Sequence, residues 1–473
     1  MIERQNLREL EAIVGPDHLL TSPEDLVCYS YDGTFAECRP DAIVSPDTTD
    51  QVAAILALAH REAIPVVPRG MASGLAAGTV PFGGGLVLNL TRMNRILEID
   101  RENLTATAQS GVITADLAAA VEREGLFYPP DPASIRQSTL GGNVACNSGG
   151  PRCLKYGVTG DYVMALEAVL PDGRVLRTGN KCLKNVTGYD LVHLLVGSEG
   201  TLAVITEVTV RLLPLPEAKR TALAIFQDIG SASQVVNLIL YAGVLPATLE
   251  IIDETAIQCV EEYLHAGLDC TAEAMLIIET DGDPESAQRE IEVAARVCTE
   301  GGAREVQVAR TSAESDELWR ARRSVSPSLG RVRPNKLGED IVVPRSAIPE
   351  MVRRIKRTAL KHDLPIVIFG HAGDGNLHPN VLFDKRDEDE LERVEAAVRE
   401  LFANAVDLGG TLSGEHGVGV LKQPYLEMAL GPLAIEVMRG IKRAFDPKGI
   451  LNPGKVLPVE QHSTSAASMR RER

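Results

Sequence analysis

The first 210 residues alternate short apolar runs with glycine-rich turns, which is typical of α/β units built round sheets. In residues 49–61 the apolar positions recur at helical spacing, and Thr49 is the expected N-cap. A second helix is predicted at 114–124, and Gly125 would end it. Apolar runs rich in Val, Leu and Ile predict strands at 65–67, 85–90, 95–99, 163–176 and 201–213.

The stretch PLPEAKR, residues 214–220, interrupts this pattern and is a natural domain boundary. Beyond it, helical and strand-like segments alternate, which indicates a second, α+β domain. Helices are predicted at 231–243, 284–300, 346–362 and 430–445, and strands at 221–226, 274–280, 304–309, 339–343 and 365–370. Residues 461–473 are polar, and we expect them to be disordered.

Composition narrows the functional classes. A net charge of −17 over 473 residues argues against a nucleic-acid partner, because neutralising phosphates requires a basic surface. No stretch reaches the roughly 18 apolar residues of a membrane span, and the N-terminus lacks an apolar signal core, so we expect a cytoplasmic protein. The eight cysteines include no C-x-x-C pair, which predicts reduced thiols and no iron–sulfur ligand spacing.

Several loops combine glycines with small polar residues. In VVPRGMASGLAAGT, residues 66–79, the glycines and Ser73 would let backbone N–H groups surround an anion, although a flexible connection is the alternative. The loop is neither a Walker A sequence nor a Rossmann fingerprint. Two further segments, 129–150 and 196–208, share its small-residue character. Together they suggest a dinucleotide held by backbone groups.

The stretch HAGDGNLHP, residues 371–379, predicts a hairpin with Asp374-Gly375 at the centre of its turn. In that register His371 and His378 face each other across the strands, at a spacing that suits two imidazoles sharing one metal ion. Asn380 lies two residues beyond His378 and shares its strand face. The alternative is a pair of polar histidines that bond to the backbone.

These segments carry a resemblance to a known family. Its motifs are PRGMASGLAAG (68–78), PPDPAS (129–134), STLGGNVACNSGG (138–150), LKYGVTGDYV (154–163), VTGYDLVHLLVGSEGTLAVITEVTVRLLP (186–214), HAGDGNLHPN (371–380), SGEHGVG (413–419) and FDPKGILNPGKVLP (445–458). With these motifs, residues 15–458 resemble the FAD-linked oxidases of the vanillyl-alcohol-oxidase (PCMH-type) superfamily. They look closest to the group of glycolate oxidase flavin subunits, D-lactate dehydrogenases and D-2-hydroxyglutarate dehydrogenases.

The resemblance implies an α+β protein in which one domain binds FAD and another binds substrate and metal. Residues 1–215 would form a PCMH-type FAD-binding domain of two α/β subdomains, and 216–430 a cap domain with an antiparallel sheet for substrate and metal. Residues 431–460 would return to the FAD domain. The implied FAD contacts are Pro68, Arg69, Gly70, Met71, Ala72, Ser73, Gly74, Leu75, Pro132, Ser134, Thr139, Gly141, Gly142, Asn143, Asn147, Gly149, Gly200, Ile205 and Asn452.

Two departures from the family pattern stand in the FAD-binding region. Ala203 replaces a glycine that many relatives have, and the 68–75 loop lacks the histidine that tethers FAD covalently in some members. We therefore expect non-covalent FAD.

The resemblance also assigns the reacting groups. A divalent metal, zinc, manganese or iron, would bind His371, His378 and Glu415, and His416 would be the catalytic base. Arg322, in ELWRARRSV (317–325), best matches the residue that binds the substrate carboxylate, and Lys336 is the second candidate for catalysis and substrate binding. Asn380 would also contact substrate. The alternative for each cation is a solvated surface side chain.

The implied activity is oxidation of a D-2-hydroxy acid to the 2-oxo acid, with D-lactate or glycolate favoured by KCLKNVTGYDL (181–191). D-2-hydroxyglutarate, another alcohol, or a non-catalytic flavin subunit of an electron-transfer complex are the alternatives. Because the chain lacks iron–sulfur cysteines, electrons would leave through an iron–sulfur subunit, an electron-transfer flavoprotein or a quinone. Such a partner could hold the protein at the inner membrane, and a homodimer is one option for its assembly.

Overall fold

The computed structural model describes residues 2–458, which divide into two compact units. Unit 1 contains residues up to 149, then 158–215, and the chain from 415 onward. Unit 2 contains 150–157 and 216–414. The chain therefore returns to unit 1 at residue 415, earlier than the expected 431, and the short segment 150–157 was not expected in unit 2. The predicted disorder of 461–473 lies outside the described residues.

Unit 1 is built on two sheets. The first has the order β1-β2-β4-β3, in which β2, β4 and β3 run parallel. The second is antiparallel, with the order β5-β6-β10-β8-β9. Their strands are β1 (Leu19–Leu20), β2 (Ala42–Val44), β3 (Val66–Arg69), β4 (Leu86–Asn89), β5 (Ile96–Asp100), β6 (Thr105–Gln109), β8 (Val163–Val169), β9 (Val175–Gly179) and β10 (Val204–Arg211), with a small pair β7 (Leu126–Phe127) and β11 (Leu213–Pro214).

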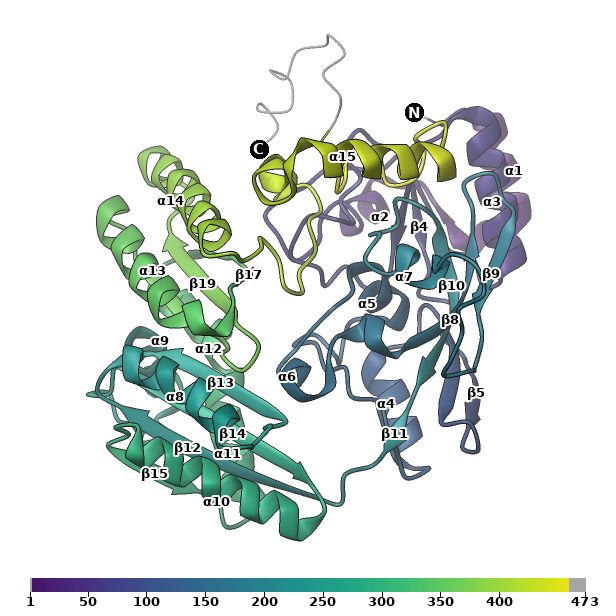
Figure 1. Ribbon diagram of the computed structural model, residues 1–473. Coiled ribbons are helices and arrows are strands. Elements are labelled where there is room, and N and C mark those ends of the chain that lie inside the picture. Colours follow the sequence, from purple (N-terminus) through teal and green to yellow (C-terminus); the bar gives the residue numbers. More distant parts are fainter. Residues whose placement is uncertain (1, 459–473) are drawn as a thin grey trace. The chain divides into compact units, whose positions relative to one another are not determined.

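Helices cover these sheets and close the core of unit 1. Figure 1 shows α1 and α3 side by side, and their apolar faces pack on the first sheet in one buried cluster. Ile450 and Leu451 join this cluster, because the C-terminal segment runs beside β3 through a bond from Val66 N to Ile450 O. The helices of unit 1 include α1 (Arg4–Val14), α2 (Pro23–Cys28), α3 (Thr49–Glu62), α4 (Thr114–Glu122), α5 (Leu140–Cys146), α7 (Leu191–Leu195) and α15 (Leu426–Phe445).

The cap of α3 differs from the prediction by one residue. Thr48, and not Thr49, accepts a hydrogen bond from Gln51 N and starts the helix. Thr49 donates instead to Glu167 Oε1 at 2.6 Å, a partner 118 residues away. Local sequence offered two adjacent threonines, and a long-range contact decided between them.

Unit 2 contains one large antiparallel sheet with the order β15-β12-β14-β13-β18-β19-β16, and β17 also pairs with β19. The strands are β12 (Ala218–Phe226), β13 (Thr248–Asp253), β14 (Ala274–Gly282), β15 (Glu305–Val308), β16 (Asn335–Gly338), β17 (Ile341–Val342), β18 (Ile366–His371) and β19 (Asn376–Phe383). Strands β13 and β19 are buried at every position, and β12, β14 and β18 are buried over most of their length, so both faces of the sheet must be covered.

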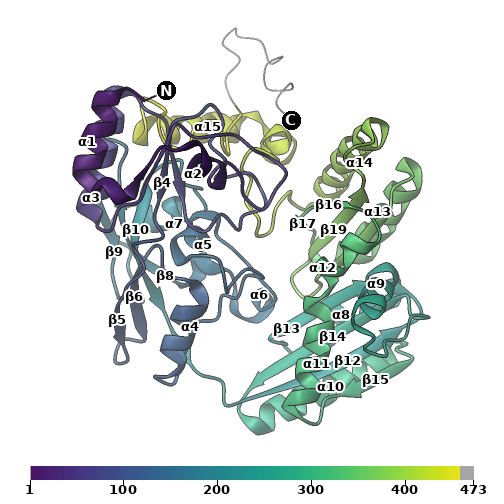
Figure 2. The same cartoon turned by 180° about the vertical axis from the view of Figure 1, so that it is seen from behind.

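Two sets of helices provide that cover, as Figures 1 and 2 show from opposite sides. One set comprises α8 (Ile229–Tyr241), α10 (Pro284–Glu300), α13 (Ile348–His362) and α14 (Glu388–Asp407). The other comprises α9 (Glu254–Leu264), α11 (Ser312–Arg323) and α12 (Val325–Ser328), which share one apolar cluster with β13, β14 and β18. The short α6 (Cys153–Tyr156) contacts β13.

Helix α10 shows how sequence specifies an element here. Asp283 caps it by accepting from Ser286 N, Pro284 occupies the first turn, and its small and branched apolar residues recur at helical spacing on the buried face. The prediction of 284–300 is confirmed at both ends.

Candidate functional site

The predicted dinucleotide loop follows β3 and meets the other glycine-rich segments within unit 1. A Cβ on Gly70 would lie 2.4 Å from Thr139 Oγ1, so only glycine permits this approach of the loop to α5. Gly200 packs against Pro68 in the same way. Asn452 Nδ2 donates to Gly78 O at 3.0 Å and to Glu199 O at 2.7 Å. Four segments that are far apart in sequence are thus brought together.

Several predicted cofactor residues use their side chains to build these loops. Arg69 is buried and donates to Tyr31 O at 2.8 Å, and burial lowers the pKa of its guanidinium. Asn143 Nδ2 donates to Thr114 Oγ1 at 2.6 Å, and Asn147 Oδ1 accepts from Gly160 N at 2.8 Å. Thr139 Oγ1 caps α5 by accepting from Gly142 N. A ligand here would therefore meet mainly backbone groups from these positions.

The remaining predicted contacts lie in the same unit. The carbonyl of Pro132 accepts from Ile135 N, and that of Ser134 accepts from Gln137 N and Ser138 N, so this segment forms a tight turn. A Cβ on Gly141 would lie 2.4 Å from Ser110 Cβ. Gly149 and Ile205 are buried. Close packing, and not flexibility, explains this small-residue composition.

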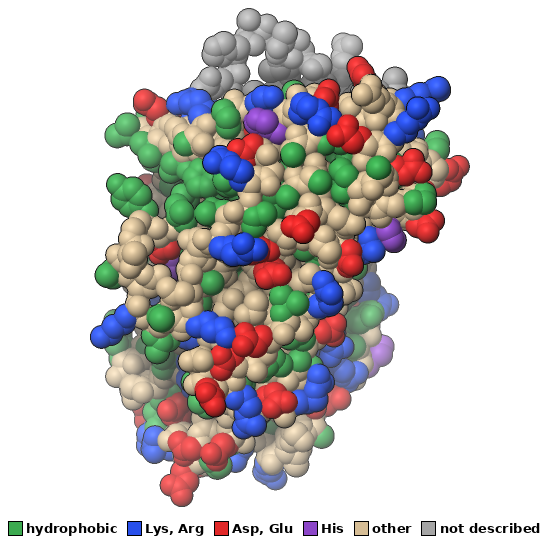
Figure 3. All heavy atoms as spheres, turned by 90° about the vertical axis from the view of Figure 1, so that its right-hand side faces the viewer, with side chains coloured by type: hydrophobic (Ala, Val, Ile, Leu, Met, Phe, Trp, Pro, Cys, Tyr) green, Lys and Arg blue, Asp and Glu red, His purple; other side chains and the backbone are tan. Residues whose placement is uncertain are grey.

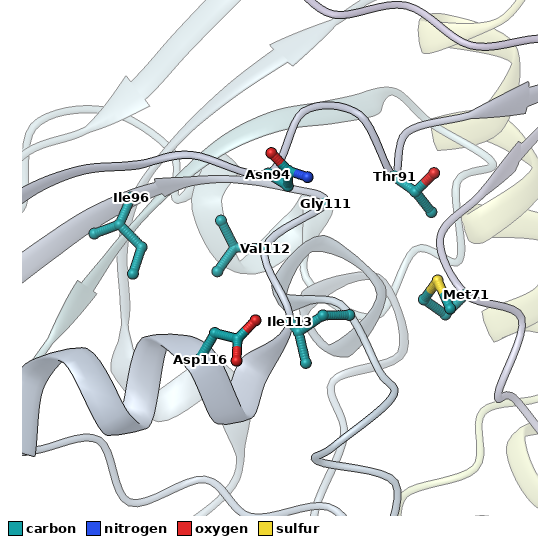
Figure 4. A pocket seen from close by; sticks show the side chains of 8 residues that line it. All are labelled: Met71, Thr91, Asn94, Ile96, Gly111, Val112, Ile113 and Asp116. Carbon is teal, nitrogen blue, oxygen red and sulfur yellow. The ribbon is translucent and has the colours of Figure 1, made fainter.

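A cavity of about 430 Å³ opens beside the loop. Figure 4 shows its lining side chains arranged round the hollow: Met71, Thr91, Asn94, Ile96, Val112, Ile113 and Asp116, with Gly111. Met71 is 51 % exposed and Leu75 is 42 % exposed, although both are large and apolar. A cavity of this size next to uncovered apolar side chains fits part of a flat dinucleotide. The residues present therefore fit FAD.

The histidine hairpin of unit 2 has a different register from the predicted one. His371 pairs with Asn376, and His378 pairs with Phe369, so the turn centres on Gly373-Asp374 and the prediction of directly opposed histidines is wrong. His371 and His378 are diagonal neighbours on one face, with ring centroids 5.1 Å apart. Diagonal neighbours remain within reach of long side chains, so the two imidazoles can still serve one ion.

A buried carboxylate joins two of the predicted site residues. Glu250 Oε1 lies 2.6 Å from His371 Nδ1, and Arg322 donates to Glu250 Oε2 from Nε at 2.7 Å and from Nη2 at 2.6 Å. Burial would raise the pKa of Glu250, but the charges and hydrogen bonds of His371 and Arg322 outweigh it and lower the pKa. Arg322 also lies over the Phe369 ring, 4.9 Å from its centroid. Arg322 is therefore a paired cation whose side chain is 13 % exposed.

Lys336 and Asn380 lie on the same sheet face. Lys336 Nζ donates to Ser326 O at 3.1 Å and to Ser326 Oγ, and burial lowers the pKa of the ammonium. Asn380 Nδ2 donates to His378 O at 2.8 Å. We call the whole set the sheet-face cluster: Glu250, Arg322, Lys336, His371, His378 and Asn380.

A second buried carboxylate, Asp340, lies beside His378 of this cluster and accepts several hydrogen bonds. Asp340 Oδ1 accepts from Asn376 Nδ2 at 2.7 Å and lies 3.9 Å from His378 Nδ1. Asp340 Oδ2 accepts from Ser413 Oγ at 2.7 Å and from Gly414 N at 2.9 Å. The next residues in the chain are Glu415 and His416, so Asp340 fixes the backbone from which they start.

Beyond His416, the chain forms hydrogen bonds with Glu199 of unit 1. The Glu199 carboxylate accepts from Val418 N at 2.7 Å and from Gly419 N at 2.9 Å. Burial raises the pKa of Glu199, and these two N–H groups act in the opposite direction. The segment that carries Glu415 and His416 is thus anchored by a carboxylate at each end.

Sequence reasoning missed Glu250, Asp340 and Glu199 as site-forming residues. Glu250 stands inside the apolar run TLEIID, and Asp340 directly precedes the apolar run IVV, so a charged residue in or beside an apolar run was the available signal. Their partners are distant in sequence: Asn376 lies 36 residues from Asp340, and His371 lies 121 residues from Glu250. Local patterns cannot supply such pairings.

The donor set suits a divalent transition metal. His371 has Nδ1 on a carboxylate, which leaves Nε2 as its metal-binding atom, and this arrangement is usual for metal-bound histidine. Imidazole nitrogens combined with carboxylate oxygens are compatible with zinc, manganese or iron. The two histidines of the cluster are therefore compatible with the predicted metal.

Comparisons with known proteins agree with this arrangement. Residues 40–179 match the family described as FAD binding domain, and residues 215–456 match FAD linked oxidases, C-terminal domain. The chain is 50 % identical over 457 residues to glycolate oxidase subunit GlcD of Bacillus subtilis (strain 168), covering 96 % of this chain and 97 % of the relative. It is 36 % identical over 454 residues to the D-lactate dehydrogenase of Anaerostipes hadrus, covering 94 % and 95 %.

The fold is also found among solved structures. A crystal structure of p-cresol methylhydroxylase with substrate bound superposes with a TM-score of 0.78 at 18 % identity, covering 95 % of this chain and 96 % of that one. The chain thus has the PCMH-type FAD-binding fold, with α+β content as expected from the sequence.

The surface and the helices add two observations. On the face drawn in Figure 3, acidic and basic side chains of the described residues are interspersed and do not gather by sign. Within residues 2–458, every helix is too short or too polar to cross a membrane.

Proposed function

Because the chain belongs to the FAD-linked oxidases, we propose that it is an FAD- and divalent-metal-dependent dehydrogenase of a D-2-hydroxy acid. The product would be the 2-oxo acid, and an external acceptor would take the electrons. D-lactate or glycolate is the favoured substrate, since similar chains carry the names glycolate oxidase subunit and D-lactate dehydrogenase.

One observation carries this proposal. Glu250 binds a cation that suits a substrate carboxylate, Arg322, and a histidine that suits a metal, His371, through its two separate oxygens. A 2-hydroxy acid has a carboxylate and a hydroxyl on adjacent carbons, and these two groups need such neighbouring partners. A guanidinium has five N–H donors, so Arg322 keeps donors for a ligand beyond those that Glu250 takes.

In the proposed reaction each side chain has one task. Arg322 binds the substrate carboxylate, and Lys336 and Asn380 line the same sheet face and orient the acid. The metal held by His371, His378 and Glu415 would lower the pKa of the substrate hydroxyl as a Lewis acid. His416 accepts the hydroxyl proton, because a neutral imidazole is a base near pH 7. The FAD, when bound, supplies N5 as the acceptor of the hydride from Cα.

The physiological acceptor belongs to the same proposal. The sequence has no iron–sulfur cysteine spacing, so we propose an iron–sulfur subunit, an electron-transfer flavoprotein or a quinone. The similar protein of Bacillus subtilis is named a glycolate oxidase subunit, which favours a protein partner. We propose a cytoplasmic enzyme that reaches the inner membrane only through such a partner, and a homodimer is one assembly to test.

An anaerobic flavin-reduction screen tests the proposed function. D-lactate, glycolate and D-2-hydroxyglutarate are mixed with the FAD-loaded protein and Zn²⁺, Mn²⁺ or Fe²⁺, and L-lactate serves as the matched enantiomer. Bleaching near 450 nm by D-lactate or glycolate is expected. Bleaching by D-2-hydroxyglutarate alone would move the substrate to the dicarboxylic alternative. Bleaching by none of the acids would favour a non-catalytic flavin subunit.

A further inference from the structure

Glu250 occupies a costly position for a carboxylate. Strand β13, with the sequence TLEIID, is buried at every position, and the Glu250 side chain is 1 % exposed. An unpaired charge at such a place strongly destabilises the folded state. Its neighbour on the same strand face, Ile252, lies in the apolar cluster with α9, α11 and α12. The charge persists only because its partners are fixed.

Both partners are fixed by the fold. Glu250 lies directly opposite His371 in the register of β13 and β18, so their 2.6 Å contact is a cross-strand pair. Arg322 comes from the last turn of α11, and its guanidinium lies over the ring of Phe369 on β18. Arg322 uses Nε and Nη2 on Glu250 Oε2 alone, so Oε1 is left for His371.

This division of the two oxygens has a chemical consequence. A carboxylate only accepts hydrogen bonds, so His371 must carry its proton on Nδ1 and present Nε2 as the metal-binding nitrogen. The same carboxylate holds one edge of Arg322, so the other edge of the guanidinium has a set direction. One residue thereby sets the spacing between a metal ligand and a carboxylate-binding cation.

We propose that Glu250 is a positioning residue that selects the His371 tautomer and orients Arg322, so that the metal and the substrate carboxylate are held at the spacing of a 2-hydroxy acid. The inference rests on the proposed function and deepens it. Glu250 touches neither substrate nor flavin in this role, and it acts through His371 and Arg322.

The variant Glu250→Gln separates this role from simple packing. A glutamine has one accepting oxygen, and Arg322, which only donates, competes for it with the Nδ1–H of His371. If the oxygen turns to Arg322, the amide NH₂ faces His371, and the imidazole must move its proton to Nε2. The metal would then lose a ligand although His371 is still present. We expect metal affinity to fall about 10- to 100-fold, the range seen when such partners of metal ligands are removed.

The neighbouring strand provides a matched control. Glu279 on β14 is a buried carboxylate that accepts from Trp319 Nε1 at 2.8 Å and lies 3.9 Å from Lys219 Nζ, so its polar partners differ from those of Glu250. Glu279→Gln should lower thermal stability but leave metal affinity unchanged. If Glu250 mattered only for stability, Glu250→Gln would also lower thermal stability and leave metal affinity unchanged.

The measurement is calorimetric titration of Zn²⁺ and Mn²⁺ into metal-stripped, FAD-loaded protein without substrate, followed by separate kcat and KM values for the hydroxy acid. Weaker metal binding and a raised KM in Glu250→Gln, with Glu279→Gln unchanged, are expected. If Glu250→Gln does not fold, Glu250→Asp keeps the charge but withdraws it by one methylene, and we expect a smaller loss. Unchanged metal affinity in either folded variant overturns the inference. If the wild type binds neither ion, the metal assignment fails together with this inference, whereas flavin bleaching by the acid still tests the proposed oxidation on its own.

Discussion

His416 is the side chain on which proton transfer depends in the proposed reaction, because a neutral imidazole accepts protons near pH 7. His416→Ala should slow flavin reduction by about 10²- to 10⁴-fold, the usual contribution of a positioned base. FAD content should stay the same, because the 68–75 loop is untouched. Stopped-flow absorbance under anaerobic conditions measures the step.

His193 offers the matching control for this substitution. It is an exposed histidine on α7 whose ring nitrogen contacts Asp190 at 2.7 Å. His193→Ala should leave flavin reduction unchanged. Near-normal reduction in His416→Ala would remove the base role from His416.

The predicted site residues illustrate what local sequence can and cannot supply. Arg322, Lys336, His371, His378 and Asn380 were named from motifs, and the structure places all of them on one sheet face. Their connection through Glu250 was missed, because β13 meets β18 more than 100 residues later. A motif identifies which residue types are present, and only strand pairing decides which of them touch.

The hairpin shows the same limit for whole elements. The sequence predicts a strand at 365–370 and a hairpin turn after it, and the structure has both, but the predicted turn centre lies one residue too far along the chain. Gly375 has φ +90°, and a Cβ there would lie 2.1 Å from Val343 O, so its place is set by packing against the chain beyond β17. The Asp374 side chain also accepts from Asn376 N and fixes the turn. Neither contact is visible in the turn sequence alone.

The turn at 415–419 carries the proposed base, His416, and its packing against unit 1 can be tested. Gly419 has φ +51°, and a Cβ there would lie 1.9 Å from Ala76 O, a backbone atom that cannot move without the loop. Gly419→Ala should lower the free energy of unfolding by roughly 2–4 kcal/mol, from the left-handed backbone and the overlap together. Chemical denaturation followed by circular dichroism measures it.

A glycine in α15 serves as the comparison for this change. Gly440 has nothing within 4 Å of an added Cβ, and it lies in a helix where alanine is preferred. Gly440→Ala should be neutral or stabilise by about 0.5–1 kcal/mol. Equal effects of the two substitutions would show that the 415–419 turn is not packed as described.

The proposed flavin site lies in unit 1 and the sheet-face cluster lies in unit 2, and the two differ in the groups that they offer to a ligand. In unit 1 the loops of 68–78 and 138–150 contact each other through glycines. Polar side chains of these loops, such as Asn143 and Asn147, form hydrogen bonds within the protein. In unit 2 charged side chains gather on one sheet face. A cofactor that stays bound can be held by shape and backbone, whereas a substrate that turns over needs charges placed at defined points.

This difference predicts how FAD leaves the protein. The loop 68–75, PRGMASGL, contains no histidine, cysteine or tyrosine that could form a bond to the flavin, and its most exposed large side chains are Met71 and Leu75. Binding by backbone groups and apolar contacts disappears when the chain unfolds. Acid precipitation should therefore release all of the FAD, and the supernatant should carry the yellow colour while the pellet is white. Flavin fluorescence on the unfolded polypeptide in a denaturing gel would contradict the prediction and would require a covalent attachment point outside this loop.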